Sequence, residues 1–239
     1  MNAWFKLLFL LSALILSTLC FVKAQIAFSR RPYQEIVVAI FPAETPFITA
    51  DTVNKLLIQK MKSSTATLKE GIALNEVENQ LKAHKMVFNA ELYSTISGKL
   101  VAEIVQREPV VKVVGKEVFY IDSNAQKMPL SPSYTASVPV IKGDLANEYF
   151  AEVRDAIAFL KAHPLYGDDL IGLVEVRDSW YQLLLGSQSI EIELGDLKKL
   201  EAKMNNYAAF MIKAEKDDLV ERYRKISLAF DGQVVCTKI

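Results

Sequence analysis

The chain has 239 residues, enough for one large domain or two small ones, and Lys plus Arg equal Asp plus Glu at 28 each. This balance leaves no strong net field that would attract nucleic acid or an acidic substrate. Gly and Pro are sparse, which argues against a long disordered region. The two cysteines, Cys20 and Cys236, are too few and too far apart to build a disulfide scaffold.

An apolar run of about sixteen residues, Leu7 to Val22, stands near the N-terminus and contains no charge, Gly or Pro. A bilayer core takes about twenty helical residues, so the run, extended by Trp4 and Phe5, predicts a transmembrane anchor. Small residues at Val22 and Ala24 also fit a cleaved signal peptide, and this alternative stays open. In both cases we expect export of the folded part, because the long remainder of the chain follows the run.

The anchor interpretation divides the N-terminal region into a cytoplasmic tail (1–6), a transmembrane anchor (7–23) and a linker (24–32). The side chains that would face the lipid include Leu7, Leu11, Leu14, Leu16 and Val22.

Residues 33–111 predict a small domain with the order strand, helix, helix, strand, strand. We expect strands at 35–41, 87–96 and 99–107, a helix at 49–61 and a second helix that starts at Asn75. Thr49 is the expected cap of the first helix, and Asn75 with Glu78 resembles a capping box. Gly98 supplies the positive φ of a tight hairpin. Both helices should pack on one face of a three-stranded sheet, which buries their apolar stripes.

Residues 112–239, after a break at Glu108-Pro109, predict a second, mixed domain with a mainly antiparallel sheet. The fold class expected for the whole chain is therefore α+β with one N-terminal transmembrane helix. A helix at 146–162 should end at His163-Pro164, and Asp196 should cap a second helix. Asp231-Gly232 between two alternating runs predicts a closing hairpin, 225–230 with 233–237. The other expected strands are 110–114, 117–122, 171–176, 181–185 and 189–194.

Residues that could carry catalysis are scarce. His84 and His163 are the only histidines, and neither has a metal-ligand spacing to a second histidine or a cysteine. The pairs Asp168-Asp169 and Asp217-Asp218 are adjacent, so their side chains diverge in most backbones. There is no nucleophile elbow and no phosphate-binding loop. We therefore expect a protein that is not an enzyme and needs no cofactor or metal.

Five stretches, in order, resemble the bacterial cell-division family FtsQ/DivIB. They are EIVVAIFPAETPFITADTVNKLL, KLVAEIVQREPVVKVV, VFYIDSNAQKMPLS, VPVIKG and YRKISLAFDGQVV. The resemblance implies that 33–111 is a POTRA domain and 112–239 the β domain of that family. It also favours the uncleaved anchor over the signal peptide. Ala125 departs from the pattern, since the family usually has Gly after the aspartate.

The resemblance further implies a scaffold of the divisome that binds FtsB/DivIC-like and FtsL-like proteins and helps control septal peptidoglycan synthesis. Its place would be the inner membrane at the division septum, with the C-terminal domain in the periplasm and no nucleic acid or small-molecule substrate. A partner strand would add to an exposed sheet edge in the closing hairpin. The candidate contact residues are Ile226, Ser227, Leu228, Ala229, Phe230, Gly232, Gln233 and Val234.

Two alternatives remain from the sequence. One is an exported POTRA-type chaperone or assembly module. The other is a secreted enzyme with a cleaved signal peptide and a site built from scattered Asp, Ser and Tyr residues.

Overall fold

The computed structural model describes residues 3–29, 35–63, 71–186 and 189–239. The chain forms two compact units that meet between Gln106 and Arg107. Both units combine helices with mixed sheets, so the α+β part of the expected fold class is confirmed. The expected boundary after residue 111 falls inside strand β4 (Pro109–Val114) of the second unit.

The expected membrane-spanning helix is wrong: within the described ranges, no helix has both the length and the apolar character needed to cross a bilayer. The N-terminal helix α1 (Ala3–Ser29) is 27 residues long. Its uninterrupted apolar run, however, ends at Lys6 and Lys23, which leaves about sixteen residues where a bilayer core needs about twenty.

Of the proposed anchor residues, four have exposed side chains on α1: Leu11, Leu14, Leu16 and Val22. The side chain of Leu7 lies outside the described part of the chain.

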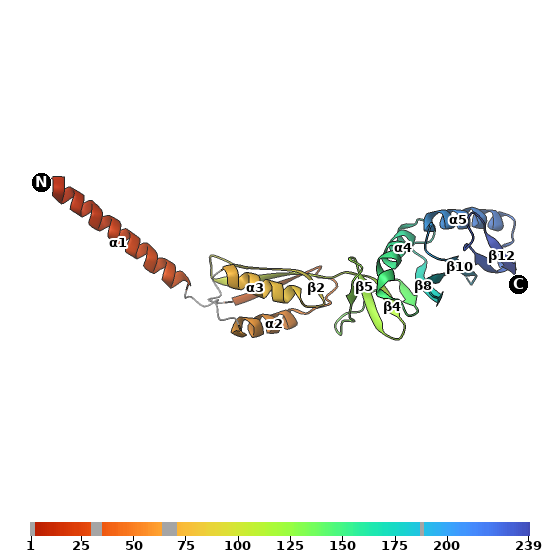
Figure 1. Ribbon diagram of the computed structural model, residues 1–239, viewed down its shortest axis with the longest axis horizontal. Coiled ribbons are helices and arrows are strands. Elements are labelled where there is room, and N and C mark those ends of the chain that lie inside the picture. The colour runs from red at the N-terminus through yellow and green to blue at the C-terminus, as the bar shows by residue number, and fades with distance from the viewer. Residues whose placement is uncertain (1–2, 30–34, 64–70, 187–188) are drawn as a thin grey trace. The chain divides into compact units, whose positions relative to one another are not determined.

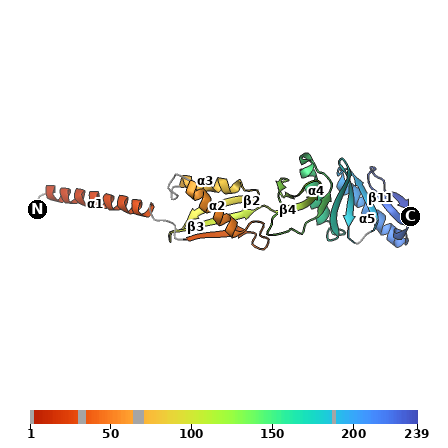
Figure 2. The ribbon, with the colours of Figure 1, turned by 90° about the horizontal axis from the view of Figure 1, so that it is seen from below.

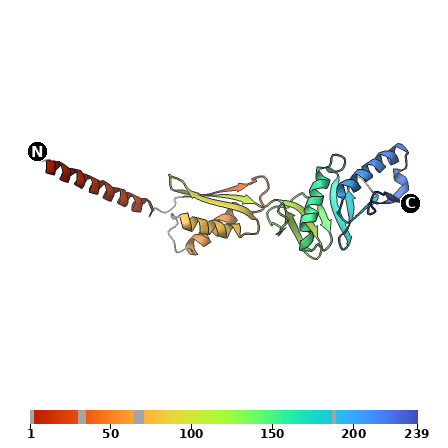
Figure 3. The ribbon, with the colours of Figure 1, turned by 45° about the horizontal axis from the view of Figure 1, so that its top comes forward.

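A three-stranded sheet forms the centre of the first unit, with the order β1-β3-β2. Two helices cover one of its faces, as Figures 1 and 3 show. β1 pairs in parallel with β3, and β2 pairs antiparallel with it. The elements in chain order are β1 (Glu35–Phe41), α2 (Ala50–Ser63), α3 (Gly71–Lys82), β2 (Val87–Ser94) and β3 (Lys99–Gln106).

The sequence predicts the start of α2 but not that of α3. Thr49 Oγ1 accepts the backbone N–H of Thr52 at 3.2 Å, which is a helix cap. α3 begins at Gly71, one turn before the expected Asn75. Glu78 forms no capping box there, because its carboxylate accepts the backbone N–H of Leu92 at 2.6 Å instead. Residues 64–70, between α2 and α3, are not among the described residues.

A nine-stranded mixed sheet spans the second unit, with the order β12-β11-β10-β9-β8-β7-β4-β5-β6. α4 (Phe150–Ala162) and α5 (Leu200–Lys216) lie over one side of it, as Figures 1 and 2 show. The remaining strands are β5 (Val118–Asp122), β6 (Lys127–Met128), β7 (Val140–Lys142), β8 (Leu170–Arg177), β9 (Trp180–Leu185), β10 (Glu191–Gly195), β11 (Tyr223–Ser227) and β12 (Val235–Lys238).

The core of the second unit lies between this sheet and the two helices. Alternate strand residues such as Val111, Leu173 and Ile226 are fully buried against Ile157 of α4 and Met204 of α5. Single-turn 3-10 helices, η1 (Asn147–Tyr149) and η2 (Val220–Arg222), precede α4 and β11.

The expected cap of α5 is wrong. α5 begins at Leu200 after Lys199, which has a φ of 52° and makes no side-chain cap. Asp196 instead forms an ion pair with Lys203, one turn into the helix. The Lys203 ammonium lies 2.7 Å from the Asp196 carboxylate. That ion pair lowers the pKa of the Asp196 carboxyl, because the nearby ammonium stabilises its charged form.

Candidate functional site

The terminal hairpin, where sequence reasoning placed the partner site, has strands at β11 and β12 joined by a loop at 228–234. The loop is longer than the two-residue turn expected at Asp231-Gly232. A turn does form there, since the Gln233 N–H bonds to the Phe230 carbonyl at 3.2 Å and Gly232 has a φ of 68°. Before the turn, the Leu228 N–H bonds to the Glu193 carbonyl of β10 at 2.7 Å.

The candidate residues fall into two groups by burial. Ile226, Ser227 and Leu228 are buried, and β11 has β10 on one side and β12 on the other, so they do not lie on an edge strand. Ala229 and Val234 are half-buried, and the residues with exposed side chains or backbone are Phe230, Gly232 and Gln233. Phe230 is 56% exposed, although a large aromatic side chain would gain free energy by burial.

The free edge of this end of the sheet is β12 itself, because no strand that the structure describes pairs with its outer side. Successive residues of a strand point their backbone groups to opposite sides. Since Leu228 bonds to β10, Ser227 and Lys225 point to β12, and their partners Val235 and Thr237 point back. Cys236 and Lys238 therefore direct their N–H and C=O groups outward.

A polar network of side chains links β11 to the neighbouring strands β10 and β9. The Trp180 indole N–H bonds to Glu193 at 2.9 Å, and Lys225 pairs with the same carboxylate at 3.1 Å. Burial opposes ionisation of Glu193, but hydrogen-bond donors, the Trp180 indole foremost, outweigh it and lower the pKa of this carboxyl. The Arg177 guanidinium lies 4.1 Å from the centre of the Trp180 ring.

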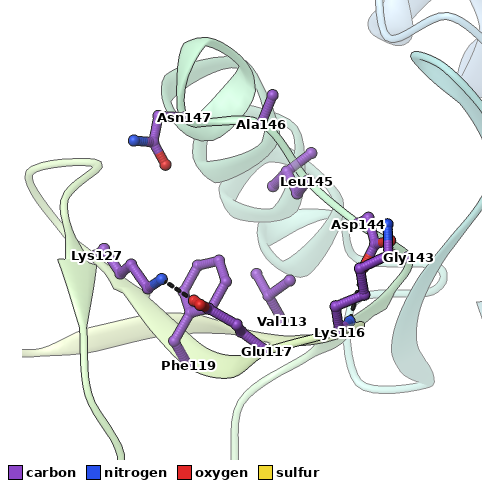
Figure 4. A pocket seen from close by; sticks show the side chains of 10 residues that line it. All are labelled: Val113, Lys116, Glu117, Phe119, Lys127, Gly143, Asp144, Leu145, Ala146 and Asn147. Atoms are coloured by element: carbon purple, nitrogen blue, oxygen red, sulfur yellow. Dashed lines mark hydrogen bonds and ion pairs between the residues drawn. The ribbon is translucent and has the colours of Figure 1, made fainter.

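A second candidate, a hollow of about 400 Å³, lies between the β4–β5 turn and the start of α4 (Figure 4). Its floor is apolar, with Val113, Phe119 and Leu145. Two ion pairs line it, Lys116 with Asp144 at 2.8 Å and Lys127 with Glu117. The hydrogen bond from Lys116 lowers the pKa of Asp144. Because each of these charges is neutralised by its neighbour, the hollow presents no net charge to a ligand.

The residues considered for chemistry do not converge. Over the described residues, no group of three or more His, Cys, Asp or Glu side chains could hold a metal ion. His84 Nδ1 accepts the Met86 N–H at 3.3 Å, and burial lowers its pKa. His163 stacks on Tyr166 with ring centres 3.9 Å apart, so both histidines take part in local packing.

The two units and the exposed edge define a class of protein: an α+β protein whose larger unit ends in an open strand. The family model described as "FtsQ/DivIB, C-terminal related" matches residues 108–237. The chain belongs to this family, and it is a cell-division protein of the FtsQ/DivIB kind. No curated protein matches the chain.

The family assignment confirms the resemblance found in the sequence. What the sequence did not reveal is that β12, not β11, is the edge strand. The pattern of alternating residues is the same for an internal and an edge strand when one face of each is exposed, so no local signal separates them.

Proposed function

We propose that this protein is a non-enzymatic scaffold of the division septum that binds FtsB/DivIC-like and FtsL-like partners by strand addition to β12. The observation that carries the proposal is the outward direction of the backbone groups of Cys236 and Lys238 on an edge strand. A partner strand could use these groups as the next strand of the sheet would.

The loop beside β12 supplies the side-chain part of the same surface. Phe230 would pack on an apolar residue of the partner, and Gly232, where the structure has no atom within 4 Å of an added Cβ, leaves room for a close backbone. Lys199 pairs with Asp231 at 2.5 Å and holds the loop near the start of α5. The first unit, as a POTRA-type module, would offer a second docking surface, and both units would work in the periplasm.

Replacing Lys238 tests the edge directly. Lys238→Pro removes an outward N–H but leaves the N–H groups that pair β12 with β11, so it should weaken binding to the FtsB/DivIC-like protein of the same organism about tenfold. Lys238→Ala keeps the N–H and is the matched control. Titration with the purified full chain measures both affinities, and circular dichroism checks the fold.

Two outcomes would contradict the proposal. One is equal affinity of Lys238→Pro and Lys238→Ala for the partner. The other is a fluorescent fusion that shows no band at mid-cell in dividing cells.

Ser227→Lys is not a suitable probe of the edge, because Ser227 is only 6% exposed and lies inside the sheet. Phe230→Ala is the better side-chain probe. We expect it to reduce partner affinity with little effect on stability, since the ring is exposed in the free protein.

A further inference from the structure

A groove runs along the C-terminal half of α5, and its lining includes Ile239, the residue that follows β12. It consists of a hollow of about 170 Å³ at Tyr166 and Ile212 and one of about 410 Å³ at Ile190 and Tyr223. Met211 and Glu215 line both hollows, so the two lie next to each other. We call this surface the α5 groove.

Two large apolar side chains at the rim of the α5 groove are open to solvent. Leu165 is 65% exposed and Ile212 is 66% exposed, and both line the smaller hollow. A single exposed leucine is ordinary in a soluble protein. Apolar rims on both sides of a concave surface are the feature that marks a docking site.

The charge of the α5 groove is one-sided. Its charged lining residues are all carboxylates: Asp169, Glu215 and Glu221. Neither Glu215 nor Glu221 forms an ion pair with any described residue, whereas every carboxylate lining the hollow at the start of α4 faces a lysine. The charge of the α5 groove is therefore complementary to a cation.

A tyrosine with a buried hydroxyl forms part of the wall of the smaller hollow. Tyr166 is 4% exposed, lines the hollow, and its hydroxyl has no hydrogen-bond partner among the described residues. Leaving a buried hydroxyl unpaired costs about 1–3 kcal/mol. Burial also raises the pKa of Tyr166 to about 12, so at neutral pH this group is a protonated donor.

We propose that the α5 groove binds a basic amphipathic segment of another protein. One apolar side chain of that segment enters the hollow between Leu165 and Ile212, and flanking Lys or Arg residues pair with Glu215 and Glu221. This surface adjoins the C-terminal end of β12 through Ile239, but it takes a different partner by a different kind of contact, so it goes beyond the scaffold function proposed above.

The test uses the full chain and a synthetic peptide that repeats Leu-Lys-Lys-Leu-Leu-Lys-Lys, with a photoreactive group in place of its central Leu. We expect binding that weakens as salt rises, with crosslinks mapped by mass spectrometry to Leu165, Met211 and Ile212. A peptide with Glu at every Lys position should not bind.

Variants locate the binding. Glu215→Lys and Ile212→Ser should each lower affinity for the lysine peptide about tenfold. Glu201→Lys, an exposed charge reversal in the first turn of the same helix, should leave it unchanged. Phe230→Ala, whose side chain lines neither hollow, should also bind the peptide normally, which separates this proposal from the one on β12.

Three results would overturn the proposal: crosslinks confined to α1, equal binding of the Glu peptide, or wild-type affinity in Glu215→Lys. Self-association of the chain through the groove would also overturn the proposal. If the chain alone dimerises in sedimentation and Ile212→Ser abolishes this, the groove binds a second copy of the chain and not a basic partner.

Discussion

Arg107, the first residue of the second unit, forms an ion pair with Asp122 in the following hairpin. Its Nε donates to Asp122 at 2.6 Å, and the two side chains are only 10% and 1% exposed. The other oxygen of Asp122 accepts the N–H groups of Asn124 and Gln126 at 3.0 and 2.7 Å. A buried charge pair whose remaining hydrogen-bonding groups are also satisfied is costly to break by removal of one partner.

We expect Asp122→Ala to lower the free energy of unfolding of the second unit by about 3–5 kcal/mol, because it removes the carboxylate that balances the largely buried Arg107 charge. Glu117→Ala is the control, since the Glu117–Lys127 pair is exposed and should contribute less than about 1 kcal/mol. Urea denaturation of both variants measures the difference. A loss at Asp122 no larger than that at Glu117 would contradict this expectation.

Ala125, in the turn after Asp122, has a φ of 56°. The turn is closed by the Ala125 N–H, which bonds to the Asp122 carbonyl at 2.9 Å. Alanine thus adopts here the left-handed conformation that glycine takes without steric cost, which accounts for the family's preference for Gly at this point.

Ala125→Gly should therefore stabilise the second unit by about 0.5–1 kcal/mol. The matched control is Ala162→Gly at the end of α4, a right-handed position where the same change should be destabilising. Thermal denaturation of the two variants should show shifts of opposite sign, and shifts of the same sign would argue against the strain at Ala125.

At the scale of elements, the sequence predicts what local chemistry determines. The bounds of β1 agree with the expected strand at 35–41, and the end of α4 with the stop at His163-Pro164. The predictions from the sequence are wrong where a side chain bonds to a distant element. Glu78 and Asp196 have the residue types of helix caps, but Leu92 and Lys203 compete for them. The order of nine strands, and with it the identity of the edge, depends on such long-range pairing.

The loop between β1 and α2 shows the same dependence. Gln106, 2% exposed at the end of β3, donates to the carbonyls of Pro42 and Thr45 at 2.7 Å each. Its side-chain oxygen accepts the N–H of Phe47 at 2.9 Å. One amide thus holds a loop about sixty residues away in the chain.

We expect Gln106→Leu to destabilise the first unit by at least about 3 kcal/mol, because it leaves buried backbone groups without partners. Gln106→Glu keeps one acceptor but places a carboxylate oxygen against the Pro42 and Thr45 carbonyls in a buried site, so it should be at least as destabilising. Hydrogen exchange of the α2 and β3 amides reports on this unit alone. Exchange as slow in Gln106→Leu as in the parent chain would rule out this role.

At the scale of the whole molecule, the two units have separate cores and the family match begins at residue 108, close to where the second unit starts. A unit with its own core can fold by itself. All of β4 and the Arg107–Asp122 pair belong to the second unit. The stability of an isolated second unit should therefore depend on whether the fragment includes Arg107 and all of β4.

We expect residues 107–239 expressed alone to unfold cooperatively and to keep the circular dichroism of a folded sheet. A fragment of 112–239, which lacks Arg107 and half of β4, should be largely unfolded at the same temperature. If both fragments behave alike, the network at Arg107 does not hold the unit together.

The strand order of the first unit also has a consequence for synthesis on the ribosome. β3 is the centre of the sheet, paired to β1 on one side and β2 on the other, yet it is the last of the three strands to be made. Until residue 106 has emerged, neither outer strand has its partner, and nascent β1 has unpaired backbone groups on both sides. The first unit must therefore fold late and all at once, and a ribosome that pauses before β3 would leave its apolar strands open to aggregation.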